Sequence, residues 1–283
     1  MEKISIIIPT LNCEQTIVDL LNALKKQTVA PDEIIVIDSD STDKTVELAK
    51  NNGAKVISIK QSEFNHGGTR NFAAKNAKGK YIVYMTQDAF PYDDYTIEKL
   101  LSSFDLDDDI VASYARQIAY HNSNEREKLI RLFNYPPVSL TKSSTSIESL
   151  GIKTYFFSDV CAMYEKEYFF KLNGFESQLN TNEDMLMAAR IIADGKKIRY
   201  EAEAKVFHSH NSTLKEIYKR NFAIGQFLAK YKNEFQNSNA NSEGVKMVKS
   251  ISKQLLNKGE IGESLLFWIE CFVKLVANKL GKL

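Results

Sequence analysis

Short apolar runs alternate with amphipathic segments along the first 90 residues of the chain. The runs are rich in β-branched and aromatic residues, as in buried strands, and the segments between them have helical spacing. This alternation predicts βαβ units and an α/β fold with a mostly parallel sheet. The expected strands are 4–8, 33–38, 55–59 and 81–85; the expected helices are 14–27, one from caps at 39–42 to 51, and one ending near 79.

The pattern is less regular after residue 90. The polar stretch 121–153, which carries one helix, is a candidate for a mobile active-site loop, because long irregular segments in domains are usually functional or disordered. From residue 214 onward the pattern predicts helices to the end. The other expected strands are 110–115, 155–164 and 198–207, and the other expected helices are 94–104, 126–133, 165–172 and 183–193.

Composition excludes several classes of protein. The formal net charge is +1 and no basic run occurs, which argues against a nucleic-acid partner. Cys13, Cys161 and Cys271 are far apart and form no CxxC pair, which argues against a disulfide framework or a zinc site and fits a reducing cytosol. The apolar run at the N-terminus is too short for a signal peptide. We therefore expect a cytoplasmic globular protein.

Carboxylates follow two of the expected parallel strands. Asp38 and Asp40 end the second strand, and Asp88 follows the fourth. Ligands of open α/β sheets bind at the carboxyl ends of the strands, where acids accept hydrogen bonds from ribose or base groups. Turn formation or helix capping is the alternative for each acid. The sequence PTLN at 9–12 has no glycine and no Walker A sequence is present, which excludes an NAD(P) or P-loop cradle.

Three further groups of residues are candidates for the same cleft. FNHGGTRN at 64–71 combines paired glycines with an arginine before a helix, which favours a diphosphate, although a simple turn is the alternative. Glu183 and Asp184 open a helix, where acids also complement the helix dipole. His208 and His210 share one face of a strand end and could complete a metal site that also contains a carboxylate.

Four motifs occur in the order seen in family 2 glycosyltransferases of the GT-A fold, and the chain resembles this family over roughly residues 3–225. The motifs are SIIIPTLN at 5–12, EIIVIDSDSTDKT at 33–45, TQDA at 86–89 and NGFESQLNTNEDMLMAAR at 173–190. FNHGGTRN and TQDAFP look like its bacterial rhamnosyltransferase branch. The resemblance implies a GT-A catalytic domain at 1–212, with a nucleotide-sugar half at about 1–115 and an acceptor half at about 116–212, and a helical C-terminal extension at 213–283.

The resemblance also implies a reaction and a site. An inverting enzyme would move rhamnose or another deoxyhexose from dTDP-rhamnose or a UDP-sugar to a glycan acceptor in cell-surface polysaccharide synthesis. Asp184 would be the catalytic base, and Asp88 would hold Mg²⁺ or Mn²⁺ with His208 or, alternatively, His210. The family's Asp-x-Asp triplet reads TQD here, so only Asp88 carries over. The expected donor-binding residues are Pro9, Thr10, Asn12, Asp38, Asp40, His66, Gly67, Gly68, Arg70, Gln87 and Asp88.

Two alternative functions stay open. The incomplete triplet would also fit a catalytically impaired sugar-nucleotide-binding partner protein. A nucleotidyltransferase is disfavoured because no glycine-rich basic loop follows the first strand.

The apolar segment 264–277 contains Glu270 and Lys274 and is too short to span a bilayer. We expect it to pack on its own domain; a homodimer contact, or contact with the inner face of the cell membrane near a polyprenyl-linked acceptor, is the alternative.

Overall fold

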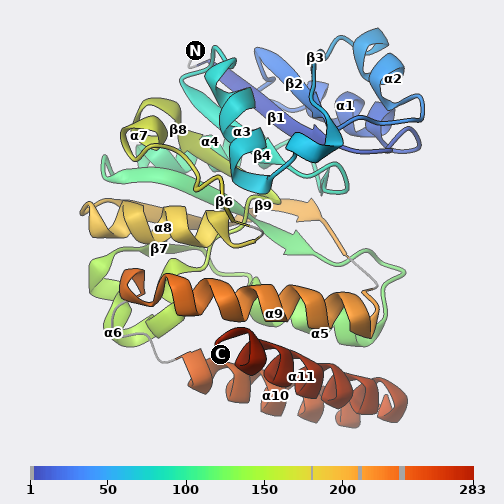
Figure 1. Ribbon diagram of the computed structural model, residues 1–283, viewed down its shortest axis with the longest axis vertical. Coiled ribbons are helices and arrows are strands. Elements are labelled where there is room, and N and C mark those ends of the chain that lie inside the picture. Colours follow the sequence, from blue (N-terminus) through green and yellow to red (C-terminus); the bar gives the residue numbers. More distant parts are fainter. Residues whose placement is uncertain (1–2, 180, 210–211, 236–239) are drawn as a thin grey trace.

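One mixed sheet runs through the protein (Figure 1). The computed structural model describes residues 3–179, 181–209, 212–235 and 240–283. Within these ranges the strand order is β3-β2-β1-β4-β8-β6-β9-β5, and β7 pairs with β9. The strands are β1 (Ile4–Thr10), β2 (Glu33–Asp38), β3 (Lys55–Ser58), β4 (Tyr81–Met85), β5 (Phe90–Pro91), β6 (Ile110–Ile118), β7 (Leu140–Lys142), β8 (Cys161–Glu165) and β9 (Lys197–Phe207).

Helices cover both faces of this sheet. One face packs against α1, α2 and α4, and the other packs against α3 and α8. Strands buried on both faces must be apolar throughout, which explains the continuous apolar runs in the sequence. The helices are α1 (Ile17–Lys25), α2 (Thr45–Asn51), α3 (His66–Lys75), α4 (Thr96–Ser102), α5 (Glu125–Asn134), α6 (Ile147–Leu150), α7 (Lys166–Lys171), α8 (Glu183–Ala193), α9 (Leu214–Lys230), α10 (Ala240–Asn257) and α11 (Ile261–Gly281).

The prediction of a mostly parallel sheet holds for β1 to β4 and needs correction beyond them. β1 pairs in parallel with β2 and β4, and β2 pairs in parallel with β3. β8 is antiparallel to both β4 and β6, while β6 is parallel to β9. β5 and β7 are antiparallel to β9. An apolar run indicates that a strand is buried but carries no information about its direction, so the pattern could not show this mixture.

Two sequence expectations in the middle of the chain are wrong. The expected strand at 155–164 begins only at Cys161, and a 3₁₀ helix occupies Gly151–Tyr155. Tyr155 and Phe157 are buried in the core, so their apolar character indicated burial and not strand pairing. The stretch 121–153 is not an irregular loop, because α5, β7 and α6 form within it. Among these elements only the helix α5 was expected.

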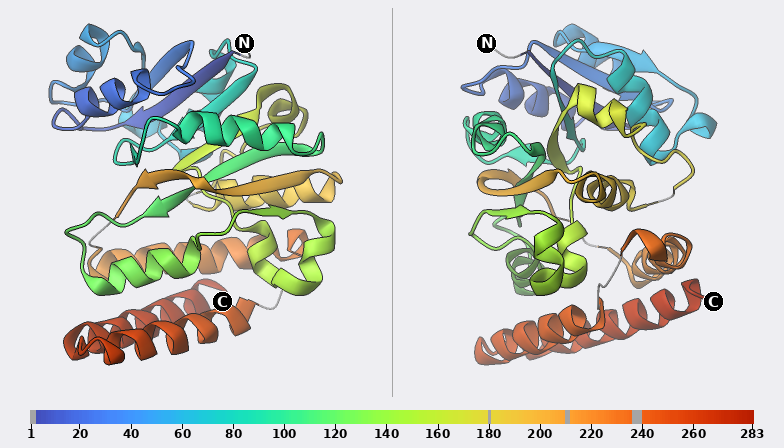
Figure 2. Two further views of the ribbon diagram at one scale, coloured as in Figure 1. Left: turned by 180° about the vertical axis from the view of Figure 1, so that it is seen from behind. Right: turned by 90° about the vertical axis from the view of Figure 1, so that its left-hand side faces the viewer.

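The three C-terminal helices form the end of the molecule opposite β1 to β3 (Figures 1 and 2). α9 and α11 cross where only glycine fits: a Cβ on Gly225 would lie 2.3 Å from the carbonyl oxygen of Asn278, and one on Gly281 would lie 2.1 Å from that of Phe222. Leu129 of α5 packs with buried residues of α10 and α11. Segment 264–277 therefore packs on its own domain along one side, as expected, while residues such as Trp268 and Phe272 on its other side are exposed. None of the described helices is long and apolar enough to cross a membrane.

Candidate active site

A cavity of about 260 Å³ lies at the carboxyl ends of β1 and β4, beside the start of α3. The hydroxyl oxygens of Ser39 and Thr86, two residues of its lining, are buried and have no hydrogen-bond partner within the described part of the chain. Since buried polar atoms normally find partners, these hydroxyls fit hydrogen bonds to a ligand. The lining consists of Pro9, Thr10, Leu11, Ser39, Gln61, Phe64, His66, Arg70, Thr86 and Gln87, of which Pro9, Thr10, His66, Arg70 and Gln87 were expected to bind the donor.

Two of the expected donor-binding residues, Gln87 in the lining and Asn12 outside it, hold the loops around this cavity. Gln87 bonds both backbone groups of Leu11, accepting from its N–H at 2.8 Å and donating to its carbonyl at 3.2 Å. Asn12 Oδ1 accepts the N–H of Thr42 at 2.9 Å and so links the loops after β1 and β2. Asp40 is exposed and, like Asn12, is not part of the lining. A direct contact of these residues with a donor stays a prediction.

Asp38 is buried at the end of β2. Its Oδ1 accepts the hydroxyls of Thr10 and Ser41 at 3.0 and 2.6 Å, and its Oδ2 accepts the N–H of Ser41 at 2.9 Å. Asp38 is 1% exposed, so its carboxylate first of all joins β1 to the loop after β2. The turn-forming alternative weighed for this acid is therefore present in the structure, whether or not the carboxylate also contacts a nucleoside.

Asp38→Ala is expected to lower the free energy of unfolding by about 3 kcal/mol, because it removes three hydrogen bonds and leaves two hydroxyls without an acceptor. Urea denaturation measures the change, and the matched control is Asp108→Ala at an exposed position. Equal midpoints for the two variants would contradict the structural role of Asp38. Donor titration of the folded Asp38 variant then reports any direct contact with the nucleotide.

The paired glycines lie inside the first turn of α3 and not in a loop before it. Asn65 caps the helix by accepting the N–H of Gly68 at 2.6 Å. A Cβ on Gly67 would lie 2.4 Å from the carbonyl oxygen of Glu176. Neither glycine lines the cavity. Close packing of the protein on itself therefore explains Gly67, and the expected contact of both glycines with a donor stays a prediction.

Asp184 lies in the first turn of α8 and accepts two backbone N–H groups. Its Oδ1 accepts from Met185 at 2.7 Å and its Oδ2 from Asp159 at 3.2 Å. Burial raises the pKa of Asp184 to about 7, and the negative charge of Glu183 contributes to this shift. A carboxyl group with a pKa near neutral pH is suited to act as a general base.

Glu183 connects Asp184 to the cavity. Its Oε1 lies 3.1 Å from Nη1 of Arg70 and 3.9 Å from Nδ1 of His66. Arg70 is 6% exposed, and its Nε lies 4.0 Å from Oδ2 of Asp159. The expected diphosphate ligand Arg70 is thus held by carboxylates of α8 and of the loop before β8, and its contact with a donor stays a prediction.

Asp159 is a second acid beside Asp184. It is 3% exposed, and its Oδ1 accepts the hydroxyl of Tyr164 at 2.7 Å. Burial, reinforced by the charge of Asp184, raises the pKa of Asp159 well above its usual range. When the pKa values of two neighbouring carboxyl groups differ in this way, the group with the higher pKa holds a proton and the other can accept one. The environment therefore favours Asp184 as the proton acceptor.

Asp88 and His208 face each other across 3.5 Å, measured from Oδ2 to Nε2. Nδ1 of His208 is 2.8 Å from Oε1 of Gln117, an oxygen that also accepts from Arg131. Nδ1 must then carry the proton, and Nε2 of a neutral ring presents a lone pair toward Asp88. A carboxylate and an imidazole nitrogen at this separation suit a divalent cation between them. His210 lies outside the described residues.

This pair does not make a complete metal site. Among the described residues, no group of three or more His, Cys, Asp or Glu could hold a metal ion. Mg²⁺ is commonly bound by one or two carboxylates together with substrate phosphates. Asp88 and His208 therefore fit a cation whose remaining ligands are water and a diphosphate, and they do not fit a closed structural site.

A larger cleft, about 810 Å³, lies between α5, α9 and α11. Tyr135 lines it, and the side-chain N–H of Gln117 donates to the Tyr135 hydroxyl at 2.6 Å. Arg220 of α9 also lines it. Burial lowers the pKa of His66 and raises that of Tyr135, and the charge of Arg220 lowers both. Arg220 of α9 is thus close enough to act electrostatically on both residues.

Comparison with known families identifies the family of this chain. The family model described as Glycosyl transferase family 2 matches residues 5–172. The chain belongs to this family. The O-antigen chain rhamnosyltransferase RfbN of Salmonella typhimurium is 40% identical over 99% of this chain and 90% of its own length. WbaN of Salmonella anatum, an O-antigen chain rhamnosyltransferase, is 39% identical over all of this chain and 90% of its own length.

Solved structures confirm the GT-A-like fold of this family 2 glycosyltransferase. The mannosyltransferase PcManGT from Pyrobaculum calidifontis, in complex with GDP-Man and Mn²⁺, superposes with a TM-score of 0.68 at 15% identity, covering 99% of this chain and 87% of that one. TarS 1–349 of S. aureus, in complex with UDP-GlcNAc, superposes with a TM-score of 0.58 at 21% identity, covering 86% and 76%. The identities are low, so these likenesses concern the fold.

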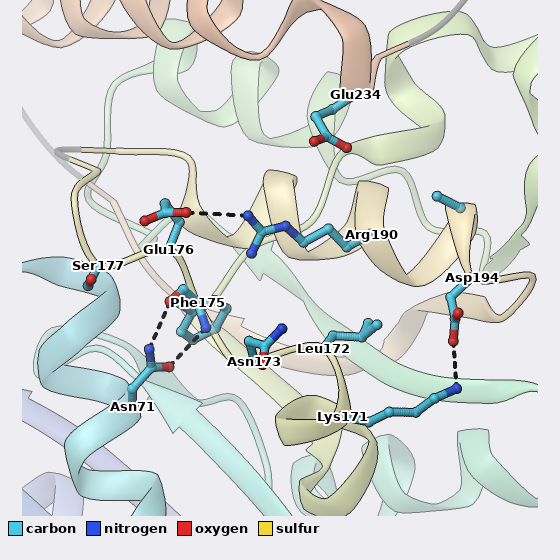
Figure 3. Close-up of a pocket in the computed structure, with 11 residues that line it drawn as sticks. Asn71, Lys171, Leu172, Asn173, Phe175, Glu176, Ser177, Arg190, Asp194 and Glu234 are labelled. Atoms are coloured by element: carbon cyan, nitrogen blue, oxygen red, sulfur yellow. Dashed lines mark hydrogen bonds and ion pairs between the residues drawn. The ribbon is translucent and has the colours of Figure 1, made fainter.

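Another pocket of the glycosyltransferase, about 780 Å³, is lined by other residues than the cavity and the cleft described above (Figure 3). Ion pairs cross it: Lys171 with Asp194 at 2.8 Å, and Arg190 with Glu176 at 3.4 Å. These pairs use four of its five charged side chains, and none of the expected site residues lines it. We therefore place the site of the glycosyltransferase at the smaller cavity and the cleft beside α9.

The sequence interpretation did not assign three residues of this arrangement. Gln117 lies at the carboxyl end of β6, and the strand-end rule that pointed to Asp38 and Asp88 could have pointed to it as well. Tyr135 follows α5 and Arg220 lies on α9, and no local signal separates them from ordinary polar residues. Only the tertiary structure brings them to the candidate site.

Proposed function

We propose that this glycosyltransferase is a metal-dependent inverting enzyme that moves rhamnose, or another deoxyhexose, from a nucleoside-diphosphate donor to a glycan acceptor. The environment of Asp184 is the observation that supports this proposal. Its pKa is about 7, its neighbour Glu183 contacts Arg70 and His66 of the cavity, and its charge acts on Tyr135 of the cleft. The rhamnose donor is supported by the identity to two rhamnosyltransferases over almost the whole chain.

The proposed reaction assigns one task to each part. Asp184 takes the proton of an acceptor hydroxyl. The oxygen of that hydroxyl forms a bond to the anomeric carbon on the face opposite the diphosphate. The bond from that carbon to the diphosphate oxygen breaks, and the leaving diphosphate keeps the electron pair. A positioned base contributes roughly 10²–10⁴-fold in rate. Single displacement inverts the anomeric configuration.

In this proposal Asp88 and His208 hold Mg²⁺ or Mn²⁺. When bound, the cation supplies positive charge that stabilises the leaving diphosphate. Gln117 fixes the tautomer of His208 so that Nε2 faces the ligand. Ser39 and Thr86 offer hydroxyls to the donor from the cavity wall. Thr86 occupies the place of the family's first triplet acid.

The proposed division of the chain follows these contacts. Residues 1–115 supply the donor cavity, and residues 116–212 supply Asp184 and about half of the acceptor side. The extension from 213 supplies the other half, including Arg220. The cleft between α5, α9 and α11 is the proposed acceptor site. It combines arginines with apolar residues such as Ile224 and Leu266, which suits an amphiphilic, polyprenyl-linked glycan.

A donor panel tests the function. The purified protein is titrated with dTDP-rhamnose, GDP-mannose and UDP-GlcNAc in the presence of Mn²⁺, and release of nucleoside diphosphate is followed with and without a lipid-linked glycan. We expect dTDP-rhamnose to bind most tightly, and its release of dTDP to depend on the acceptor. NMR of the product should show an inverted anomeric centre. Binding without any turnover on a range of acceptors would favour the alternative of a catalytically impaired partner protein.

A further inference from the structure

The outer side of α11 is apolar and uncovered in the described chain. Five large side chains, spaced four, three, four and three residues apart, fall on one side of the helix and are between 54% and 72% exposed. They are Ile261, Leu265, Trp268, Phe272 and Leu275. Both views in Figure 2 show α10 and α11 as the outermost layer of the molecule. Exposed apolar surface gathered in this way marks an interaction site.

Lysines outnumber acids around this stripe, since residues 244–283 contain seven lysines and three glutamates. Lys246, Lys258 and Lys274 pair with Glu243, Glu125 and Glu270, whereas Lys249, Lys253, Lys279 and Lys282 are exposed. Two of these glutamates, Glu263 and Glu270, point inward and pair with Arg126 of α5 at 3.2 and 3.3 Å. The exposed Lys279 and Lys282 continue the stripe at its C-terminal end. The outward surface therefore combines apolar and cationic groups and has its acids turned away.

On α10, the exposed Lys249 and Lys253 project opposite the buried Ile251, which faces the protein. A second copy of this surface would bring lysines against lysines, which disfavours a symmetric dimer here. An anionic lipid surface has the complementary charge, and apolar side chains flanked by lysines are typical of helices that lie in a membrane interface. We propose that the stripe of α11, with the lysines of α10 and α11, docks on a bilayer containing anionic lipids.

This docking would bring the acceptor cleft to the lipid surface. Leu266 belongs both to α11 and to the lining of the cleft, and Ile269 lies on the helix between Leu266 and the stripe. Apolar surface is thus continuous from the outer side of α11 to the mouth of the cleft. An acceptor anchored in the bilayer could then reach the cleft with its polar end alone. The docking itself does not depend on the proposed function.

Trp268 makes the proposal directly testable, since it is the only tryptophan in the sequence. The full-length protein is mixed with vesicles of phosphatidylglycerol and phosphatidylethanolamine, or with vesicles of phosphatidylcholine alone. With the anionic vesicles we expect flotation, a shift of the emission to shorter wavelength, and quenching by bromine-labelled lipid tails. Unchanged emission and no flotation would overturn the proposal. So would a dimer in sedimentation whose Trp268 is already shielded without lipid.

Matched variants identify the surface. Phe272→Ser is expected to weaken vesicle binding at least about tenfold, because a phenyl group no longer leaves water. Lys279→Gln with Lys282→Gln is expected to weaken binding to anionic vesicles about fivefold per lysine and to leave phosphatidylcholine unaffected. Leu106→Ser, also at an exposed apolar position, is the control and should bind as wild type. Equal binding by all variants would overturn the assigned surface; melting curves verify folding.

Discussion

Asp184→Asn is expected to lower kcat by roughly 10²-fold or more and to leave donor affinity near the wild-type value. Asparagine keeps the size of the side chain and one acceptor oxygen in the first turn of α8, but it cannot take a proton. The measurement is single turnover with bound donor and saturating acceptor, together with a donor titration. A melting curve close to wild type separates lost chemistry from lost structure.

The pH dependence of wild-type activity should report the titration of Asp184. The base must be deprotonated to act, and the pKa of Asp184 is raised to about 7, so kcat/KM should rise as pH increases through about 7. Asp184→Asn should lose this rise. Glu183→Gln is the informative neighbour, because removing its negative charge should lower the pKa of Asp184 and move the rise to lower pH.

Wild-type turnover in Asp184→Asn would exclude Asp184 as the base. Glu183 and Asp159 would then be the remaining acids at this place. The environment of Asp159 argues against it, since burial holds its proton, and Glu183 is engaged by Arg70. The same tests on Glu183→Gln and Asp159→Asn would decide between them.

The sequence predicted the parts of the fold that local pattern determines. The runs at 4–8, 33–38 and 81–85 are continuous apolar stretches that suit only buried strands, and all three formed. The apolar residues around Tyr155 and Phe157 carry the same signal but pack outside any ladder. Whether a buried run joins a sheet depends on partners elsewhere in the chain, which periodicity does not encode.

The site shows the same division between local and distant information. Asp88 and Asp184 were found because they occur in motifs at the end of a strand and the start of a helix. Arg70 and Glu183 form their ion pair across 113 residues, and the neighbour that explains Gly67 is the backbone of Glu176. Contacts of this kind exist only after folding. Sequence reasoning accordingly assigned Gly67 to a ligand and did not assign Gln117.

Asp88→Asn is expected to remove cation dependence and activity together. Asparagine keeps the shape of the side chain but loses the negative charge that faces His208 at 3.5 Å. Loss of metal stabilisation of the leaving diphosphate corresponds to several kcal/mol, or roughly 10²-fold or more in kcat. Mn²⁺ binding, followed by electron paramagnetic resonance, provides a readout that does not require turnover. The exposed Asp108→Asn is the matched control.

The incomplete ligand set predicts that Mn²⁺ and dTDP strengthen each other's binding. Because the described residues offer only Asp88 and His208, the diphosphate must supply other ligands, and Mn²⁺ should bind much more tightly when dTDP is present. By linkage, dTDP should bind more tightly with Mn²⁺ by the same factor. Asp88→Asn should abolish this mutual enhancement and Asp108→Asn should keep it. Full turnover of the wild type in excess EDTA, or equal Mn²⁺ affinity with and without dTDP, would show that Asp88 and His208 serve the donor without a metal.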